Sequence, residues 1–119
     1  MALQLSLLGK FEAVLEENPV TRFRGDKVRA LLAYLAIEGN HPHRREKLAT
    51  LLWSEVPDKT ARQSLSVAYF RLRQALDKQA GFSISEQLFS NDRKTVEAHI
   101  GDLFRCDVVR FRQLVQGLA

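Results

Sequence analysis

The chain has 119 residues, 45% of them hydrophobic and 27% charged, which is typical of one globular domain and excludes an intrinsically disordered chain. Its net charge of +4 favours an anionic partner such as nucleic acid. No apolar run reaches the roughly 18 residues of a membrane span, and the N-terminus lacks a signal-peptide pattern, so we expect a cytoplasmic protein. The single cysteine, Cys106, excludes an internal disulfide and is expected to be a small buried hydrophobe.

Three short strands and a helix are predicted in the first third of the chain. Apolar runs separated by turn residues predict strands over residues 3–8, 11–15 and 20–23. Asp26 is a suitable N-cap for the first helix, which carries apolar residues at helical spacing. Gly39 and Asn40 would end this helix, because both favour the left-handed conformation of a C-terminal cap.

A second helix is predicted to begin near Arg45. Its inward-facing residues are Leu48, Leu51, Leu52 and Trp53. Trp53 is interpreted as a core anchor, because large aromatic side chains are mostly buried. Before this helix, His41 and His43 flank a proline in what we expect to be a solvent-facing turn, since the chain has no paired Cys/His set that would make a metal site.

The most informative segment is a long amphipathic stretch, which predicts a third helix over about residues 58–78. Its buried stripe would be Ala61, Leu65, Ala68, Tyr69, Leu72 and Leu76. The opposite face carries Gln63, Ser66, Val67, Phe70, Arg71 and Gln74, with Arg62 and Arg73 on its flanks. Between Lys59 and Lys78 there are five basic residues and one acid, Asp77. Such a face suits DNA phosphates and base edges; the alternative is an ordinary basic surface helix.

The remainder of the chain predicts a strand, a hairpin and a short helix. A strand is expected over residues 82–84, and a β-hairpin over 88–98 whose polar tip is Asn91, Asp92, Arg93 and Lys94. The two basic residues at the tip would lie beside the long helix if the hairpin packs against it; otherwise the tip is a solvated turn. From Cys106 onward an amphipathic helix is predicted.

Nothing in the sequence indicates an enzyme. The six glycines are dispersed and form no phosphate-binding loop, and no His-Glu-x-x-His pattern is present. The lone cysteine has no context that marks a nucleophile. We therefore expect no catalytic residues, no metal and no cofactor.

Several segments together resemble the bacterial SARP regulators, named for Streptomyces antibiotic regulatory proteins. Residues 26–36 and 41–53 are similar to the first two helices of their N-terminal domain, and residues 61–65 and 72–76 to the two ends of its recognition helix. The resemblance implies an α+β fold: an OmpR-type winged helix-turn-helix with an N-terminal antiparallel sheet, three helices and a C-terminal β-hairpin wing. Residues 1–100 would form this domain. Residues 101–119 would be a linker and the start of a truncated helical activator domain. Residues 107–111 resemble the first residues of that domain in the family.

The resemblance also implies roles for individual residues. The recognition helix would enter the major groove and present Gln63, Ser64, Val67, Phe70, Arg71 and Arg73 to DNA. The wing tip, with Arg93 and Lys94, would approach the adjacent minor groove or backbone. RNA polymerase would contact the loop Ser54, Glu55, Val56, Pro57, Asp58 and Lys59. Arg44 stands where the family often has a serine that caps the second helix.

The sequence thus predicts a sequence-specific double-stranded DNA-binding domain of a bacterial transcriptional regulator. As the family binds tandem direct repeats, head-to-tail dimers on DNA are expected, with half-sites about one helical turn apart. The alternative is a winged-helix module whose long helix docks an acidic protein. Exposed Val67 and Phe70 favour that alternative, because apolar residues within a basic rim also suit a protein interface.

Overall fold

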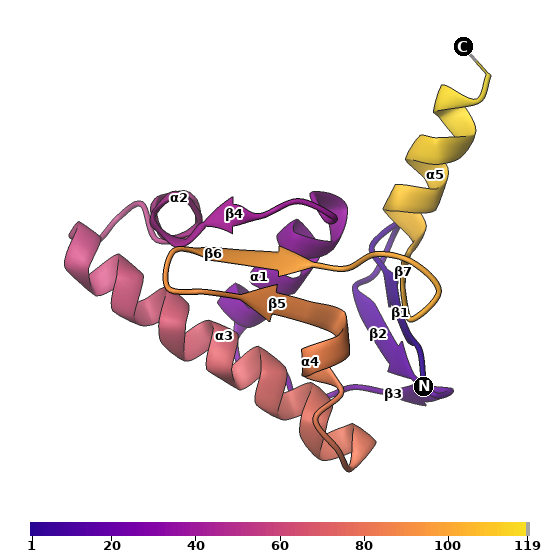
Figure 1. Cartoon of the computed structure of the whole chain (residues 1–119), viewed down its shortest axis with the longest axis horizontal. Helices are drawn as coiled ribbons and strands as arrows, with labels where there is room; N and C mark the ends of the chain where they lie inside the picture. The colour runs from indigo at the N-terminus through magenta and orange to yellow at the C-terminus, as the bar shows by residue number, and fades with distance from the viewer. Residues whose placement is uncertain (119) are drawn as a thin grey trace.

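The computed structural model describes residues 1–118, which form five helices and two β-sheets. The helices are α1 (Asp26–Ile37), α2 (Arg45–Leu52), α3 (Asp58–Ala80), α4 (Ser85–Leu88) and α5 (Asp107–Gln116). In Figure 1, α3 crosses the molecule as its longest element, with the hairpin of β5 and β6 beside it and α5 rising from the opposite end. The α+β class predicted from the sequence is confirmed.

The first sheet has the order β3-β2-β1-β7. Its strands are β1 (Leu3–Ser6), β2 (Glu12–Leu15), β3 (Asn18–Pro19) and β7 (Phe104–Cys106). The predicted strand over residues 20–23 is wrong: this segment is a loop in which Val20 and Phe23 are buried at 6% exposure each. β7 pairs in parallel with β1, so a segment that the sequence assigned to a linker belongs to this sheet.

The second sheet has the order β4-β6-β5 and contains the predicted hairpin. β5 (Phe89–Asn91) pairs antiparallel with β6 (Thr95–Ala98), and β4 (His43–Arg44) adds to the outer edge of β6. His43 was expected in a solvent-facing turn. It is instead a partly buried strand residue whose ring meets that of Tyr34 edge-on at 5.5 Å.

The first two helices lie where the sequence predicts, but their ends and faces differ in detail. Gly25, at φ 88°, is the N-cap of α1, and Asp26 is its first residue, where the carboxylate pairs with Arg29 at 2.6 Å. Arg44 caps α2 without a side-chain hydrogen bond, as expected where a capping serine is missing. Leu51 was expected to face inward, yet it is 53% exposed, because an eight-residue helix buries only one narrow stripe.

The predicted strand over residues 82–84 is also wrong. Gly81 ends α3 in the left-handed conformation, at φ 82°, and the chain turns directly into α4. Asp77 fixes this turn, since its carboxylate accepts hydrogen bonds from the Ser85 amide and hydroxyl at 2.8 and 2.9 Å. Ile84 is fully buried beneath the turn, so the apolar run reflects core packing without a strand.

The core forms where α1, α2 and α3 pack together and against both sheets. All six predicted stripe residues of α3 are buried, at no more than 5% exposure. Cys106 is buried as expected. Trp53 packs against the core as predicted but is only partly buried, at the end of α2, where the Lys27 ammonium group lies 5.8 Å from its ring.

The final helix, α5, contacts α1 and β1 but has no buried residue. Asp107 holds its start, because its carboxylate accepts the amide hydrogens of Leu7 and Leu8 at 2.8 and 3.0 Å. Burial acts to raise the pKa of Asp107, but these amide hydrogen bonds outweigh it and lower the pKa. Position 119 of the predicted second region lies outside the described residues. None of the described helices combines the length and apolarity needed to cross a membrane.

Candidate nucleic-acid interface

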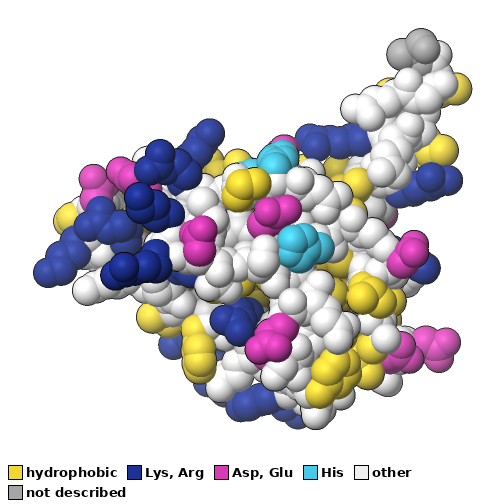
Figure 2. Space-filling view, viewed as in Figure 1, with side chains coloured by type: hydrophobic (Ala, Val, Ile, Leu, Met, Phe, Trp, Pro, Cys, Tyr) yellow, Lys and Arg dark blue, Asp and Glu magenta, His cyan; other side chains and the backbone are white. Residues whose placement is uncertain are grey.

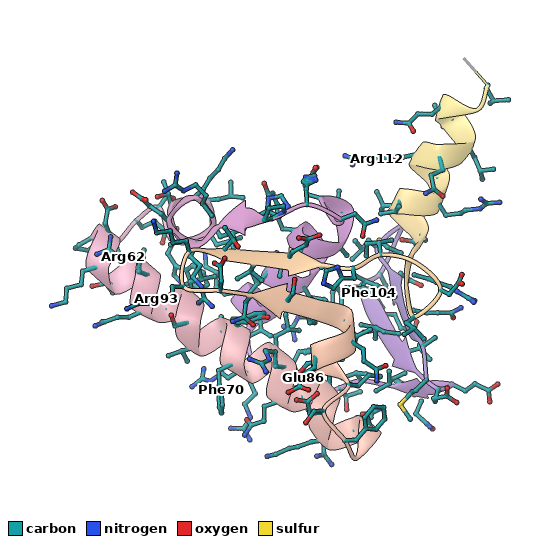
Figure 3. All side chains as sticks on the ribbon, in the orientation of Figure 1. Arg62, Phe70, Glu86, Arg93, Phe104 and Arg112 are labelled. Atoms are coloured by element: carbon teal, nitrogen blue, oxygen red, sulfur yellow. The ribbon has the colours of Figure 1, made fainter. Side chains whose placement is uncertain are left out.

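The outward face of α3 is a long, exposed surface without acidic side chains. The helix has 23 residues and is therefore about 35 Å long at 1.5 Å per residue. Gln63, Ser66 and Gln74 are exposed on it, and Val67 and Phe70 are exposed to 48% and 62%. Figure 3 shows Phe70 pointing away from the body of the domain. Val67 and Phe70 thus form an exposed apolar pair within an acid-free face, which makes this face the first candidate for binding a partner.

The wing tip is fixed beside the N-terminal half of α3. The Tyr69 hydroxyl donates to Asn91 Oδ1 at 3.0 Å, and the Arg45 Nε group donates to the Asp92 carbonyl at 3.2 Å. The Arg45 amide donates to the Lys94 carbonyl at 2.7 Å. These bonds join α3, the start of α2 and the tip, so the hairpin packs against the long helix and its tip is not a free turn.

The tip also has internal order. Asp92 Oδ1 accepts hydrogen bonds from the amides of Lys94 and Thr95 at 2.8 and 2.7 Å. These amides, together with the Thr95 hydroxyl, lower the pKa of Asp92. The tip thus keeps one shape in which Arg93 and Lys94 are exposed.

Four exposed cations gather where the tip meets α3. Arg44, Arg62, Arg93 and Lys94, called here the wing-side cluster, line a groove of about 380 Å³ together with Arg45, Glu46 and Ser66. Figure 2 shows basic side chains massed over this end of the molecule, and Figure 3 shows Arg62 and Arg93 beside each other. Closely spaced cations with one carboxylate create a local field that attracts anions.

Arg73 was predicted to flank the outward face and to face DNA, but its side chain is held against the body of the domain. Its guanidinium group lies 5.5 Å from the Tyr69 ring centre, and its Nε group is 3.4 Å from the Ser85 hydroxyl oxygen. Arg45 approaches the same ring at 5.7 Å. Burial of Tyr69 raises the pKa of its phenol, although both guanidinium groups act to lower it. Arg73 therefore supports the joint between α3, α4 and the hairpin.

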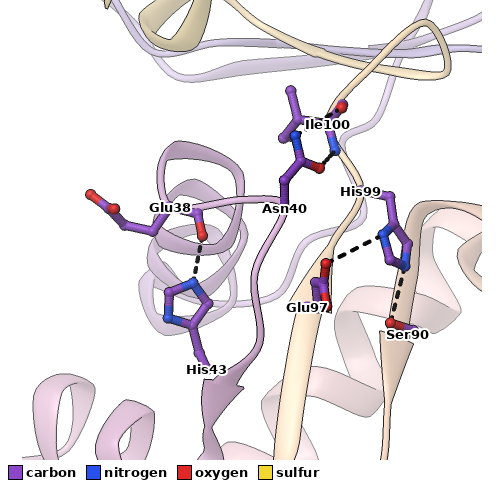
Figure 4. A network of polar contacts seen from close by, with 7 residues as sticks. All are labelled: Glu38, Asn40, His43, Ser90, Glu97, His99 and Ile100. Atoms are coloured by element: carbon purple, nitrogen blue, oxygen red, sulfur yellow. Dashed lines mark hydrogen bonds and ion pairs between the residues drawn. The ribbon is translucent and has the colours of Figure 1, made fainter.

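The base of the wing is attached to the end of α1 (Figure 4). The Asn40 side chain donates to the Ile100 carbonyl at 3.1 Å and accepts the Ile100 amide at 2.8 Å. The backbone amide of Asn40 donates to the Ala98 carbonyl at 2.8 Å, and His43 Nε2 donates to the Glu38 carbonyl. Tip and base are thus both anchored, which holds the hairpin at a fixed position relative to α3.

The opposite flank of α3 carries residues that sequence reasoning missed. Arg71, predicted on the outward face, lies beside the loop that connects β3 to α1, where it lines a groove with Arg22 and Arg24. Ser64 is partly buried on this same flank. Four arginines that lie beside α3 come from segments distant from it in sequence: Arg22, Arg24, Arg44 and Arg45. In the sequence only their charge indicated a role in binding, and charge alone does not predict that they meet at one helix.

The segment predicted to contact RNA polymerase is exposed throughout. Residues 54–59 form the turn after α2 and the first turn of α3, with Val56 at 37% exposure. Asp58 is the first residue of α3, and Pro57 is its N-cap. Nothing in the geometry assigns a partner to this segment.

The fold is of the class in which a three-helix unit carries a hairpin beside its longest helix. No protein-family model and no curated protein matches the chain. Among solved structures, it is similar to Mycobacterium tuberculosis EmbR in complex with a low affinity phosphopeptide, at 32% identity and a TM-score of 0.75 over 92% of this chain. The chain spans 28% of the length of that EmbR chain. The similarity to EmbR, a SARP-family regulator, supports a SARP-like winged-helix domain.

Proposed function

We propose that this chain is a sequence-specific, double-stranded DNA-binding domain of a bacterial transcriptional regulator, with a winged helix-turn-helix of the OmpR type. One observation supports this above all: an acid-free, exposed face on α3 lies beside an anchored basic wing tip. Its similarity to the regulator EmbR points to the same class of function.

In the proposed complex, the outward face of α3 enters the major groove, which is wide enough for one helix. Gln63 and Gln74 carry the amide that pairs with adenine, and Val67 offers a methyl group to the C5-methyl of thymine. Ser66 donates its hydroxyl hydrogen to the Arg62 carbonyl at 3.2 Å, which leaves its oxygen free to accept from a base. These groups provide sequence choice.

The wing-side cluster supplies affinity that does not depend on sequence. Arg62, Arg93 and Lys94 would neutralise phosphates of the adjacent backbone or minor groove, because Arg and Lys contacts to phosphate release condensed counterions. The fixed wing tip favours this role, since cations held in place before binding lose less entropy on contact.

The remaining parts of the proposal concern partners. The exposed segment Ser54–Lys59 would contact RNA polymerase, with Val56 and the neighbouring exposed Leu51 as its apolar centre. Two copies would bind direct repeats head to tail, so that both lie on one face of the duplex. The proposed activity is binding in the cytoplasm, without catalysis or cofactor.

A second candidate function is docking of an acidic protein. The exposure of Phe70 and Val67 favours it, because buried aromatic residues commonly anchor protein interfaces. The EmbR structure contains a phosphopeptide, but this chain spans only 28% of that protein. The acid-free outward face of α3 lies beside the wing-side cluster, and this arrangement favours the regularly charged phosphate backbone of DNA over an acidic protein.

Binding-site selection from random duplex DNA, followed by Val67→Ser, tests the proposal. We expect the variant to lose preference at one T·A position, with a change of about 1 kcal/mol for the lost methyl contact, and to keep its salt-driven binding to random DNA. If the chain docks a protein instead, no sequence will be enriched, and Val67→Ser will leave any weak DNA association unchanged.

A further inference from the structure

The loop that connects β3 to α1 carries two exposed arginines on a fixed backbone. Arg22 and Arg24 are exposed, whereas Val20 and Phe23 are buried at 6% each and hold the loop to the core. The Val20 amide donates to the Ala13 carbonyl at 2.8 Å. Val20 and Phe23 thus face the core, whereas the side chains of Arg22 and Arg24 are exposed to solvent.

Further contacts fasten this loop to α1 and α3. Arg29 of α1 donates to the Phe23 carbonyl at 3.1 Å, and the Phe11 and Phe23 rings meet edge-on at 6.1 Å. Gln79, near the end of α3, donates to the carbonyls of Asn18 and Pro19 at 3.1 and 3.0 Å. The loop is therefore held in a defined position beside the C-terminal half of α3.

The loop and α3 enclose a basic groove of about 610 Å³. Its four cations, Arg22, Arg24, Arg71 and Lys78, are called here the arm-side cluster. The other residues that line the groove, Thr21, Phe23, Gln74 and Ala75, are uncharged, so no carboxylate neutralises the cluster there. Within residues 1–118, neither Arg22 nor Arg24 takes part in a side-chain hydrogen bond or an ion pair. Both remain available to a ligand.

The two basic clusters lie on opposite flanks of α3. Arg62 and Arg71 are nine positions apart, which at about 100° per residue places them about 180° apart around the helix. Arg62 lines the wing-side groove and Arg71 the arm-side groove. Between them lies the outward face with Phe70. A helix about 10–12 Å wide fills a major groove of about 12 Å, so its two flanks meet the backbones of different strands.

We propose that the Thr21–Gly25 loop is a second phosphate-binding arm of this domain. Arg22 and Arg24, together with Arg71 and Lys78, bind the backbone of the DNA strand opposite to the one held by the wing-side cluster. This inference rests on the proposed function. Contacts on both walls of the groove fix how deeply and at what angle α3 enters it, which positions the base-contacting side chains.

The test measures binding to a random-sequence DNA duplex at several salt concentrations, because phosphate contacts do not depend on sequence. The variant is Arg22→Ala/Arg24→Ala. Its charge-matched control is Arg105→Ala/Arg110→Ala, which removes two exposed cations that line neither groove beside α3. Arg22→Lys/Arg24→Lys keeps the charge, and circular dichroism checks the fold of each protein.

We expect Arg22→Ala/Arg24→Ala to reduce the slope of log K against log salt by about 1.8, at about 0.9 per phosphate contact. When the salt concentration rises from about 50 to 200 mM, the factor by which the affinity falls should therefore be about twelve times smaller for the variant than for the wild type. The lysine variant should keep most of the slope. If the Arg22→Ala/Arg24→Ala variant has the same slope as the Arg105→Ala/Arg110→Ala control, the loop does not bind phosphate and the inference is wrong. If the wild type shows no salt-dependent binding at all, the proposed function fails together with the arm.

A second measurement tests the opposite-strand arrangement. Neutral methylphosphonate linkages are placed in one strand at a time of a selected duplex. Arg22→Ala/Arg24→Ala should become less sensitive than the wild type to neutralisation of one strand, and Arg62→Ala/Arg93→Ala to neutralisation of the other. If both variants lose sensitivity to the same strand, the two clusters do not face opposite walls and the inference is wrong.

Discussion

The hydroxyl of Tyr69 is the most direct link between α3 and the wing, and its removal isolates that link. Tyr69→Phe keeps the ring, which is 4% exposed and packs edge-on against Phe89 at 6.1 Å. It deletes only the 3.0 Å hydrogen bond to Asn91. Because Asn91 is exposed, water replaces the lost donor, and the cost is that of one net hydrogen bond, about 0.5–1.5 kcal/mol. Tyr69→Ala would also lose the ring, at about 3–5 kcal/mol.

Thermal and denaturant unfolding measure this loss. For a domain of this size each kcal/mol lowers the melting temperature by about 3–5 °C. The matched control is Tyr34→Phe, because within residues 1–118 the Tyr34 hydroxyl takes part in no hydrogen bond, and we expect its stability to equal that of the wild type. Tyr69→Phe should also weaken DNA binding through the less firmly held tip. Equal stability of the Tyr69 and Tyr34 variants, with unchanged DNA affinity, would refute the link between helix and wing.

Three further predictions concern the scaffold. Trp53→Ala should cost about 1–3 kcal/mol, less than the about 3–5 kcal/mol of a fully buried tryptophan, because Trp53 is only partly buried; denaturant unfolding measures it. Gly39→Ala should destabilise by about 1–3 kcal/mol, because a Cβ atom there would lie 2.5 Å from Ile100 Cγ1. Ile100→Ala in the same protein should remove part of that cost, and non-additive unfolding energies in the double-mutant cycle would reveal it. Asp92 and Asp107 have lowered pKa values, so the ionised carboxylates stabilise the folded domain fully at a pH above the ordinary pKa of 3.8. This contribution to the free energy of unfolding is lost as the pH falls below that value. Unfolding measured from neutral to acid pH should show this loss, and Asp107→Asn should reduce it.

The sequence predicts those parts of the structure in which one segment carries its own signal. The six-residue stripe of α3 repeats at helical spacing over many turns, and all six residues are buried as expected. The hairpin was recognisable from the polar tip around Asp92, which forms its own hydrogen bonds. Local patterns of this kind do not depend on the rest of the chain.

Other features arise only from packing between distant segments. β4 and β7 have two and three residues, and each exists because a strand far away in sequence pairs with it. Arg73 was predicted to face DNA, but the Tyr69 ring and Ser85 hold it sideways. Arg22 of the arm lies in the segment 20–23, which was predicted to be a strand but is a loop, and Arg24 follows that segment. The candidate site was therefore predictable along α3 and at the wing tip, whereas the arginines that other segments bring to the flanks of α3 were not.

The proposed DNA interface consists of the outward face of α3 together with the wing tip. Titration of an isotope-labelled chain with a selected duplex, followed through the amide chemical shifts, locates the contact surface directly. We expect the largest changes along the outward face from Arg62 to Gln74 and at Arg93 and Lys94, with little change in α5. Changes confined to α5 or to residues 54–59, with α3 unaffected, would contradict it.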